Sequence, residues 1–246
     1  MRYLILSDIH ANWEALQAVL ARAQSSYDRI VCCGDVVGYG ADPDAVTEWT
    51  RGNIGSIVRG NHDKACAGLE DLEWFNSIAR ASAVWTHQIM KPDNIAYLHD
   101  LAKGPERIDG FQIVHGSPLD EDEYVVSEHD VAQVAPYLDA AVSFFGHTHL
   151  QCGFLCHRNG VRRLRGVNTE ADAEVLDLEA GASYLINPGS VGQPRDGDPR
   201  AAYAIYQPDA CLVTLCRAEY DVAAAQKKIL AAGLPELLAL RLGAGI

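Results

Sequence analysis

The chain has 246 residues, of which 48% are hydrophobic and 22% charged, and its formal net charge at pH 7 is −13. This composition is typical of a globular protein with enough material for one large domain. The negative charge disfavours a long nucleic acid as partner, because binding a polyanion requires clustered lysine and arginine. A small phosphate substrate stays possible.

Targeting signals are not evident in the sequence. No apolar run approaches membrane-spanning length, and the first strand-like run turns polar at Ser7 and Asp8, too early for a signal peptide. We therefore expect a cytoplasmic protein without a membrane partner, and the sequence leaves homo-oligomerisation open. Seven cysteines, two of them adjacent at Cys32 and Cys33, fit reduced and buried thiols.

The first half of the chain alternates short apolar runs with amphipathic segments. Strands are predicted at residues 2–6, 29–33 and 56–58, and helices at 13–23, where Asn12 is the expected cap, and at 43–50. This order predicts a largely parallel sheet with helices on its faces. Residues 64–103 form a helical insertion that is broken at Pro92.

The second half is rich in predicted strands. Asp109-Gly110 and Asn159-Gly160 are hairpin signals. A helix is expected at residues 130–138, and the further strands are expected at 106–108, 111–114, 141–145, 183–186, 202–206 and 211–215. The tail from residue 221 is helical, with a break at 233–235. We expect one domain over residues 1–217 with a helical tail, 218–246, packed on it.

Five polar blocks follow predicted strands, which is where open α/β sheets place their functional sites. The blocks are Asp8-Ile9-His10, Gly34-Asp35, Gly60-Asn61-His62-Asp63, His115-Gly116 and Gly146-His147-Thr148-His149. Carboxylate, imidazole and amide groups are ligands of a divalent metal. Any one block is weak evidence, since a lone histidine is more often structural, but five in order form a complete ligand set.

These blocks resemble the ordered motifs of the calcineurin-like metallophosphoesterase superfamily, specifically its small bacterial and archaeal phosphodiesterase-type branch. All five motifs are present without substitution, and Asn187-Pro188-Gly189-Ser190-Val191-Gly192 is similar to a further loop of the small members. The resemblance implies an α/β fold built as a four-layer α/β/β/α sandwich. It also implies an enzyme that hydrolyses phosphoesters by direct attack of a metal-activated water on phosphorus, with no covalent intermediate.

The family pattern implies two divalent metal ions, with manganese favoured over iron, zinc, cobalt or nickel. One ion would take Asp8, His10, Asp35 and His149. The other would take Asp35, Asn61, His115 and His147. Asp35 would bridge the two ions, because a carboxylate offers two oxygens and a negative charge.

His62 is the imidazole left over from this assignment, and the resemblance implies that it is a general acid, with Asp63 or another carboxylate orienting it. Asn12, Tyr39 and Arg195 are weaker candidates for substrate contacts. A loop arginine such as Arg195 can bind phosphate bidentately, or it can simply be solvated.

The site motifs do not define the substrate. A phosphodiesterase is our first hypothesis. The alternatives are a phosphomonoesterase, a nucleotide pyrophosphatase or a protein phosphatase, and a non-catalytic binding scaffold is disfavoured because no ligand is missing. Residues 64–103 could form a lid, but we expect Trp74, Phe75 and Trp85 to be helix core instead.

Other polar clusters have simpler interpretations. The acidic run at residues 120–123 is interpreted as a solvated loop, and the arginines around Asn159-Gly160 as a solvated hairpin. Cys211 and Arg217 have the spacing of a cysteine-phosphatase loop, but the intervening residues are typical of a strand and lack glycine.

Overall fold

The computed structural model describes residues 1–246 and contains two six-stranded sheets. The first sheet has the order β3-β2-β1-β11-β12-β9 and the second β4-β5-β6-β10-β7-β8. The strands are β1 (Tyr3–Leu6), β2 (Arg29–Cys32), β3 (Ser56–Ile57), β4 (Glu106–Ile108), β5 (Phe111–Ile113), β6 (Val142–Phe144), β7 (Cys152–His157), β8 (Gly160–Leu164), β9 (Ala173–Asp177), β10 (Ser183–Asn187), β11 (Ala201–Gln207) and β12 (Leu212–Ala218). The helices are α1 (Trp13–Ala23), α2 (Pro43–Asn53), α3 (Asn61–Cys66), α4 (Ser77–Ile89), α5 (Pro92–His99), α6 (Glu128–Val134), α7 (Val222–Ala231) and α8 (Glu236–Ala244), with 3₁₀ turns at Leu72–Trp74, Ala135–Tyr137 and Pro208–Ala210.

The two sheets face each other across a shared apolar core. In β1, Tyr3 and Ile5 point into this core, whereas Leu4 and Leu6 point to the outer face, as the two-residue period of a strand requires. The second sheet contributes rings such as Phe111 to the same core, where it packs edge-on against Tyr3 at 4.9 Å between ring centroids. A strand that is buried on both faces consists of consecutive apolar residues. The sequence of β1, Tyr3 to Leu6, has this pattern.

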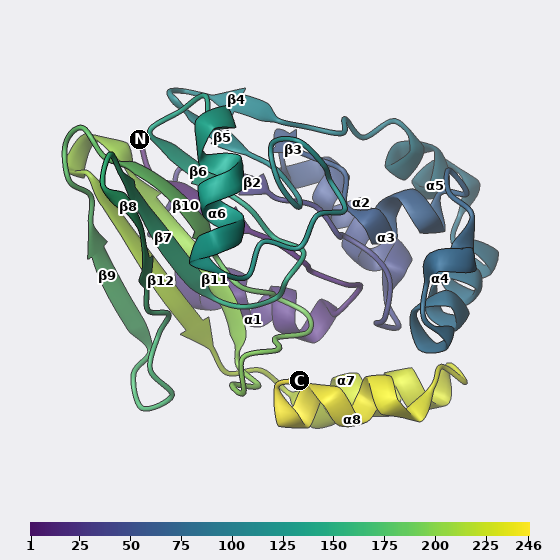
Figure 1. Ribbon diagram of the computed structural model, residues 1–246. Coiled ribbons are helices and arrows are strands. Elements are labelled where there is room, and N and C mark those ends of the chain that lie inside the picture. The colour runs from purple at the N-terminus through teal and green to yellow at the C-terminus, as the bar shows by residue number, and fades with distance from the viewer.

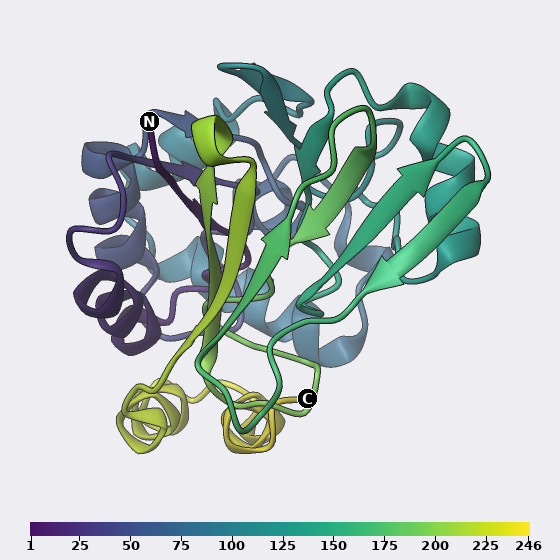
Figure 2. The same ribbon diagram turned by 90° about the vertical axis from the view of Figure 1, so that its left-hand side faces the viewer.

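Helices cover the outer faces of both sheets. On one side α1, α2 and α5 supply Leu16, Val46 and Leu98 to the cluster on the outer face of the first sheet. On the other side α6 packs Val131 and Val134 over the second sheet. Figure 2 shows these layers, with the purple and blue helices at the left and α6 at the right of the two sheets. The four-layer α/β/β/α sandwich is confirmed.

The strand pairing differs from the largely parallel sheet that we predicted. Only β3-β2-β1 and β5-β6-β10 pair in parallel, and the remaining six pairings are antiparallel. Strands β1, β2 and β3 of the first half pair in parallel, as expected, but β5, β6 and β10 of the second half do so as well. Antiparallel strands extend the first sheet on one side (β11, β12 and β9) and the second sheet on both sides (β4 on one, β7 and β8 on the other), so both sheets are mixed.

The helical tail lies along one end of the sandwich, as Figure 1 shows in yellow. Asp221 caps α7 by accepting a hydrogen bond from the backbone N–H of Ala224, and the chain turns at Gly233 into α8. The buried faces of the two helices share an apolar cluster with Tyr39 of the loop after β2. The tail therefore supports that loop. No helix in the structure is long and apolar enough to cross a membrane.

The insertion contains α4 and α5, and Pro92 begins α5 where the break was predicted. The expectation that Trp74 belongs to the helix core is wrong, because its side chain is 90% exposed. Phe75 and Trp85 are half-buried and pack against neighbouring apolar clusters. Trp74 is the last residue of a 3₁₀ turn that precedes α4, so it does not belong to the amphipathic pattern of that helix.

Candidate metal centre

Each predicted ligand lies just beyond the carboxyl end of a strand. Asp8 follows β1, Asp35 follows β2 and Asn61 follows β3, all in the parallel half of the first sheet. His115 follows β5, and the pair His147 and His149 follows β6, in the parallel part of the second sheet. Parallel strands end at the same edge of a sheet, so the sandwich brings all these loops to one place.

The loops at this edge are conformationally strained. Ten non-glycine residues have a positive φ, and seven of them belong to these loops: Asp8, His10, Ala11, Asp35, Tyr39, His147 and His149. Such backbone is unfavourable for residues with a Cβ and is found mainly at functional sites. Gly60 shows how closely the loops approach, since a Cβ there would collide with the carboxylate of Asp35. The glycines of the predicted blocks are thus required by the close packing of ligand loops.

Four of the predicted ligands form a first buried cluster of Asp8, His10, Asp35 and His149, whose ligand atoms all lie within 4.8 Å of one another. Nε2 of His10 is 2.9 Å from Nε2 of His149 and 3.6 Å from Oδ2 of Asp35. Nε2 of His149 is 3.3 Å from Oδ1 of Asp8. All four side chains are at most 2% exposed.

Asp35, His115 and His147 form a second cluster that shares Asp35 with the first. Nε2 of His115 lies 3.4 Å from Oδ2 of Asp35 and 3.2 Å from Oδ1 of Asn61. Nδ1 of His147 lies 2.9 Å from the same amide oxygen. Oδ1 of Asp35 accepts a hydrogen bond from the backbone N–H of His62, whereas the buried Oδ2 has no hydrogen-bond partner.

The four imidazoles are oriented by backbone carbonyl groups. Nδ1 of His10, His115 and His149 donates to the carbonyl oxygens of Val37, Cys33 and Gln193, at 2.9, 2.8 and 2.6 Å. His147 is reversed, and its Nε2 donates to the carbonyl of Asp122 at 3.1 Å. Because a carbonyl can only accept, each contact fixes a proton on that nitrogen and directs the other ring nitrogen into the cluster, where it can bind a metal once it is deprotonated.

Burial and mutual charge perturb the pKa values of the cluster. Burial, with a smaller effect from Asp35, raises the pKa of Asp8 to about 7. Burial opposes ionisation of Asp35 too, but the positive charge of the adjacent His115 outweighs burial and holds the pKa of Asp35 well below its ordinary value. Burial lowers the pKa of His10 and His149 well below the ordinary value and that of His147 to about 3, so these rings are neutral and able to bind a metal.

Asp63, the carboxylate that we named first as a partner of His62, does not orient it. Its carboxylate accepts hydrogen bonds from the backbone N–H groups of Gly60, Asp35, Val36 and Val37. It therefore fixes the loop that carries Asp35 against the start of α3. Aromatic contacts position His62 instead: its ring centroid lies 4.2 Å from that of Tyr39 and 5.3 Å from that of Phe75.

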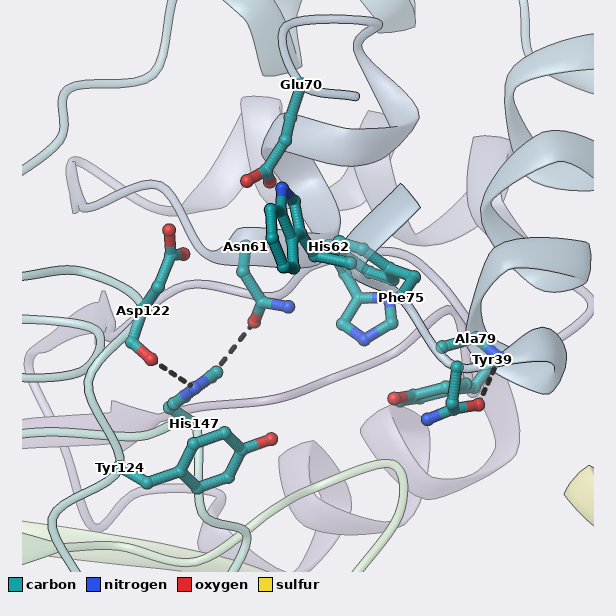
Figure 3. A pocket seen from close by; sticks show the side chains of 11 residues that line it. Tyr39, Asn61, His62, Glu70, Phe75, Ala79, Asp122, Tyr124 and His147 are labelled. Carbon is teal, nitrogen blue, oxygen red and sulfur yellow. Dashed lines mark hydrogen bonds between the residues drawn. The ribbon is translucent and has the colours of Figure 1, made fainter. Parts of the chain in front are cut away.

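A cleft of about 340 Å³ opens directly onto the second cluster and is lined by Tyr39, Asn61, His62, Glu70, Trp74, Phe75, Asn76, Ala79, Asp122, Tyr124 and His147. Figure 3 shows His147 with Tyr124 on one side of this space and Tyr39 on the other. His62 is buried and its Nδ1 has no hydrogen-bond partner. Burial lowers the pKa of His62 to about 4.

The weaker substrate candidates have different positions. Nη2 of Arg195 donates to the hydroxyl of Tyr39 at 3.3 Å, and its Nε is buried without a partner, so the guanidinium lies behind the cleft wall. Tyr39 lines the cleft itself. Asn12 is structural in this arrangement: Oδ1 caps α1 through the N–H of Ala15, and Nδ2 donates to the carbonyl of Gly192.

The acidic run at residues 120–123 is a loop, as expected, and Asp120 and Asp122 are exposed, but the loop is held by ion pairs and Glu121 is buried. Glu121 is 6% exposed and pairs with Arg59 at 2.9 Å, and Asp122 pairs with Lys64 at 2.6 Å while its carbonyl holds His147. Tyr124 stacks on the His147 ring with 4.0 Å between centroids. The sequence did not reveal these contacts, because they join segments about 25 to 60 residues apart with no shared motif.

Comparisons with known proteins agree with this geometry. The family model described as "Calcineurin-like phosphoesterase superfamily domain" matches residues 1–210. An uncharacterized protein of Methanocaldococcus jannaschii is 37% identical over 98% of this chain and 97% of its own length. The crystal structure of a metallophosphoesterase from Sphaerobacter thermophilus is 42% identical, with a TM-score of 0.85 over 100% of this chain and 99% of that one. A hypothetical protein of Pyrococcus horikoshii shares the fold, with 18% identity and a TM-score of 0.78 over 100% and 98% of the two chains.

The sandwich and its Asp/His cluster define a metal-dependent phosphoric ester hydrolase. The chain belongs to the calcineurin-like phosphoesterase superfamily.

The residues present fit a divalent metal. Oxygen and imidazole nitrogen donors without thiolate suit first-row divalent ions. The unpartnered Oδ2 of Asp35 lies between His10 and His115, at 3.6 and 3.4 Å, where a cation would satisfy it. The cluster is a divalent-metal site.

Proposed function

We propose that the protein is a phosphodiesterase that uses two divalent ions, with manganese favoured, and that water attacks phosphorus directly. One observation carries the two-ion proposal: Asp35 belongs to both ligand clusters, and its Oδ2 is within 3.6 Å of ligand nitrogens from each. Asp8, His10 and His149 complete one ion's ligand set, and Asn61, His115 and His147 the other. When bound, two such ions supply an activated water and neutralise charge on the phosphoryl oxygens.

The remaining chemistry belongs to side chains of the cleft. His62 adjoins Asn61 and lines the cleft, which supports the proposal that it gives a proton to the departing alcohol. Its pKa is lowered by burial to about 4, and an anionic phosphate beside it would raise that pKa toward the range a general acid requires. The rings of Tyr39 and Phe75 hold the imidazole in place.

The charges of the cleft favour a diester over a monoester or a pyrophosphate. Glu70 and Asp122 line the cleft, and no lysine or arginine does. A diester carries one negative charge and a monoester two near neutral pH, so the additional charge is disfavoured by these carboxylates. The small volume of the cleft fits a low-molecular-weight substrate.

Hydrolysis of bis-p-nitrophenyl phosphate and of p-nitrophenyl phosphate, measured after chelation and after return of manganese, tests the proposal. We expect chelation to abolish activity, manganese to restore it, and the diester to have the larger kcat/KM. Activity with no bound metal contradicts the metal mechanism. A larger kcat/KM for the monoester makes the protein a phosphomonoesterase, and preference for a dinucleoside polyphosphate or a phosphoprotein supports a pyrophosphatase or a protein phosphatase. Inactivity of the metal-loaded protein on all of them favours a binding scaffold.

A further inference from the structure

Two segments at the mouth of the cleft are both rich in acidic residues and end in aromatic residues. Residues 70–75 combine three acidic residues with Trp74 and Phe75, and residues 120–124 combine four acidic residues with Tyr124. Glu70 and Trp74 from one segment and Asp122 and Tyr124 from the other line the cleft. Figure 3 shows Asp122 beside the predicted metal ligands Asn61 and His147, with Glu70 farther out, above Asn61.

The carboxylates at the mouth exceed the available cations. Lys64 contacts Glu70, Glu121 and Asp122 at 3.3, 3.5 and 2.6 Å, and Arg59 pairs with Glu121. Three carboxylates thus share two cations. The buried Oε2 of Glu70 has no hydrogen-bond partner in spite of its approach to Lys64.

The acidic excess extends beyond these three carboxylates. Asp71, Glu73, Asp120 and Glu123 have no ion pair at all. The mouth is therefore net negative.

The aromatic side chains at the mouth are unusually open. Trp74 is 90% exposed and Tyr124 is 55% exposed, although both lie beside a concave site. Tyr124 is fixed through its stacking on His147, which itself donates to the carbonyl of Asp122. Open aromatic faces next to carboxylates attract organic cations, through the negative ring face and the charge of the acids together.

We propose that the cleft mouth binds an organic cation, such as a quaternary ammonium group, that the phosphoester substrate carries. This inference rests on the proposed function, because it names the substrate class of the same site. With divalent ions bound among Asp8, Asp35 and the histidines, the inner end of the cleft is positive and the outer end negative. This polarity is complementary to a zwitterionic phosphodiester, with its phosphate inward and its cation at Trp74 and Tyr124.

The test compares two diesters of equal shape. Choline p-nitrophenyl phosphate carries a trimethylammonium group, and the 3,3-dimethylbutyl ester replaces its nitrogen by carbon. We expect kcat/KM of the manganese-loaded enzyme to be about fivefold higher for the choline ester at low salt, and the ratio to fall toward one at about 0.5 M NaCl. Calorimetric binding of phosphocholine and of 3,3-dimethylbutyl phosphate should show the same preference without any turnover.

Substitutions at the cleft mouth test which residues cause the preference for the choline ester. Trp74→Ala and Glu70→Gln should each reduce the preference, Trp74→Phe should keep most of it, and Glu236→Gln, which removes an exposed acid at the start of α8, should leave it unchanged. If kcat/KM is equal for the two esters and the two phosphates bind equally, the cation site is contradicted, whereas the proposed phosphodiesterase activity is not. Preference for a nucleoside ester regardless of charge also overturns it, since the rings would then stack on bases. Absence of hydrolysis for every ester contradicts the proposed function instead, and the binding experiment still decides on the cation.

Discussion

At the scale of single residues, Asp35 is the side chain on which the two ligand clusters depend. Asp35→Asn removes the charge and replaces one carboxylate oxygen by an amide nitrogen that cannot bind a cation. We expect this variant to lose more metal than Asp8→Asn, and to lose activity at least about 100-fold on bis-p-nitrophenyl phosphate. Metal analysis and turnover of both variants on one substrate measure this. An Asp8→Asn variant as damaged as Asp35→Asn contradicts the shared role.

His62 can be separated from its metal-binding neighbours, because it belongs to neither cluster. His62→Ala should keep its metal content and slow an alkyl or nucleoside ester by about 10²–10⁴, since a poor leaving group needs a proton. A nitrophenyl ester of the same charge should be slowed far less, because nitrophenolate departs without an acid. Equal slowing of both esters argues against general acid catalysis, and loss of metal from the variant makes His62 a ligand.

The ligands were accessible from sequence because each follows a strand in a motif with fixed spacing. Parallel strands that end together bring such motifs into contact without further information. The supporting residues were not accessible. Asp63 accepts hydrogen bonds from four backbone N–H groups and does not contact His62. Tyr124 stacks on His147, although it belongs to an acidic loop whose composition is typical of a solvent-exposed segment. Contacts of that kind have no local periodicity or motif.

At the scale of secondary structure, the sequence predicted buried strands and capped helices well, but it did not predict the strand at the edge of the first sheet. β9 was missed because four of its five residues are exposed and Glu174 and Asp177 are poor strand formers. It forms at the edge of the first sheet only because β12 offers a partner.

The start of β12 was also predicted one residue too early. Cys211, predicted to begin this strand, is instead an exposed turn residue with φ of 53°. The hairpin arginines Arg162 and Arg163 lie on β8, the exposed edge of the second sheet, where charge discourages pairing with another sheet.

The helical tail offers a prediction about packing. Leu242 of α8 is 3% exposed and lines a small cavity with His10 and Tyr39, whereas Leu240 of the same helix is 58% exposed. Leu242→Ala should lower the free energy of unfolding by about 2–4 kcal/mol, because it removes buried methyl groups and leaves a cavity. Leu240→Ala should change it by less than about 0.5 kcal/mol. Urea denaturation of both variants gives the comparison, and equal effects would mean that α8 is not held by this face.

At the scale of the whole molecule, charge is distributed unevenly. The chain carries a formal charge of −13, yet the interior concentrates imidazoles around Asp8 and Asp35, where bound cations reverse the local sign. A substrate phosphate is attracted to this local field rather than to the molecule as a whole. Total charge therefore says little about small substrates, although it does disfavour a polyanion that must lie along the surface.

The buried cluster should also couple metal binding to the stability of the entire fold. Without cations, Asp8 and Asp35 face each other in a buried site, and Oδ2 of Asp35 lacks a partner. Metal bound only by the folded chain stabilises it by about 2.7 kcal/mol at 100 times the Kd. For a protein of this size that corresponds to a rise in Tm of about 5–10 °C.

Thermal unfolding at increasing manganese concentrations, starting from chelated protein, should therefore show a Tm that climbs with the logarithm of metal concentration. Asp35→Asn should show little of this rise, while Glu236→Gln should follow the wild type. A rise that is the same in all three proteins would place the stabilising ions elsewhere on the acidic surface.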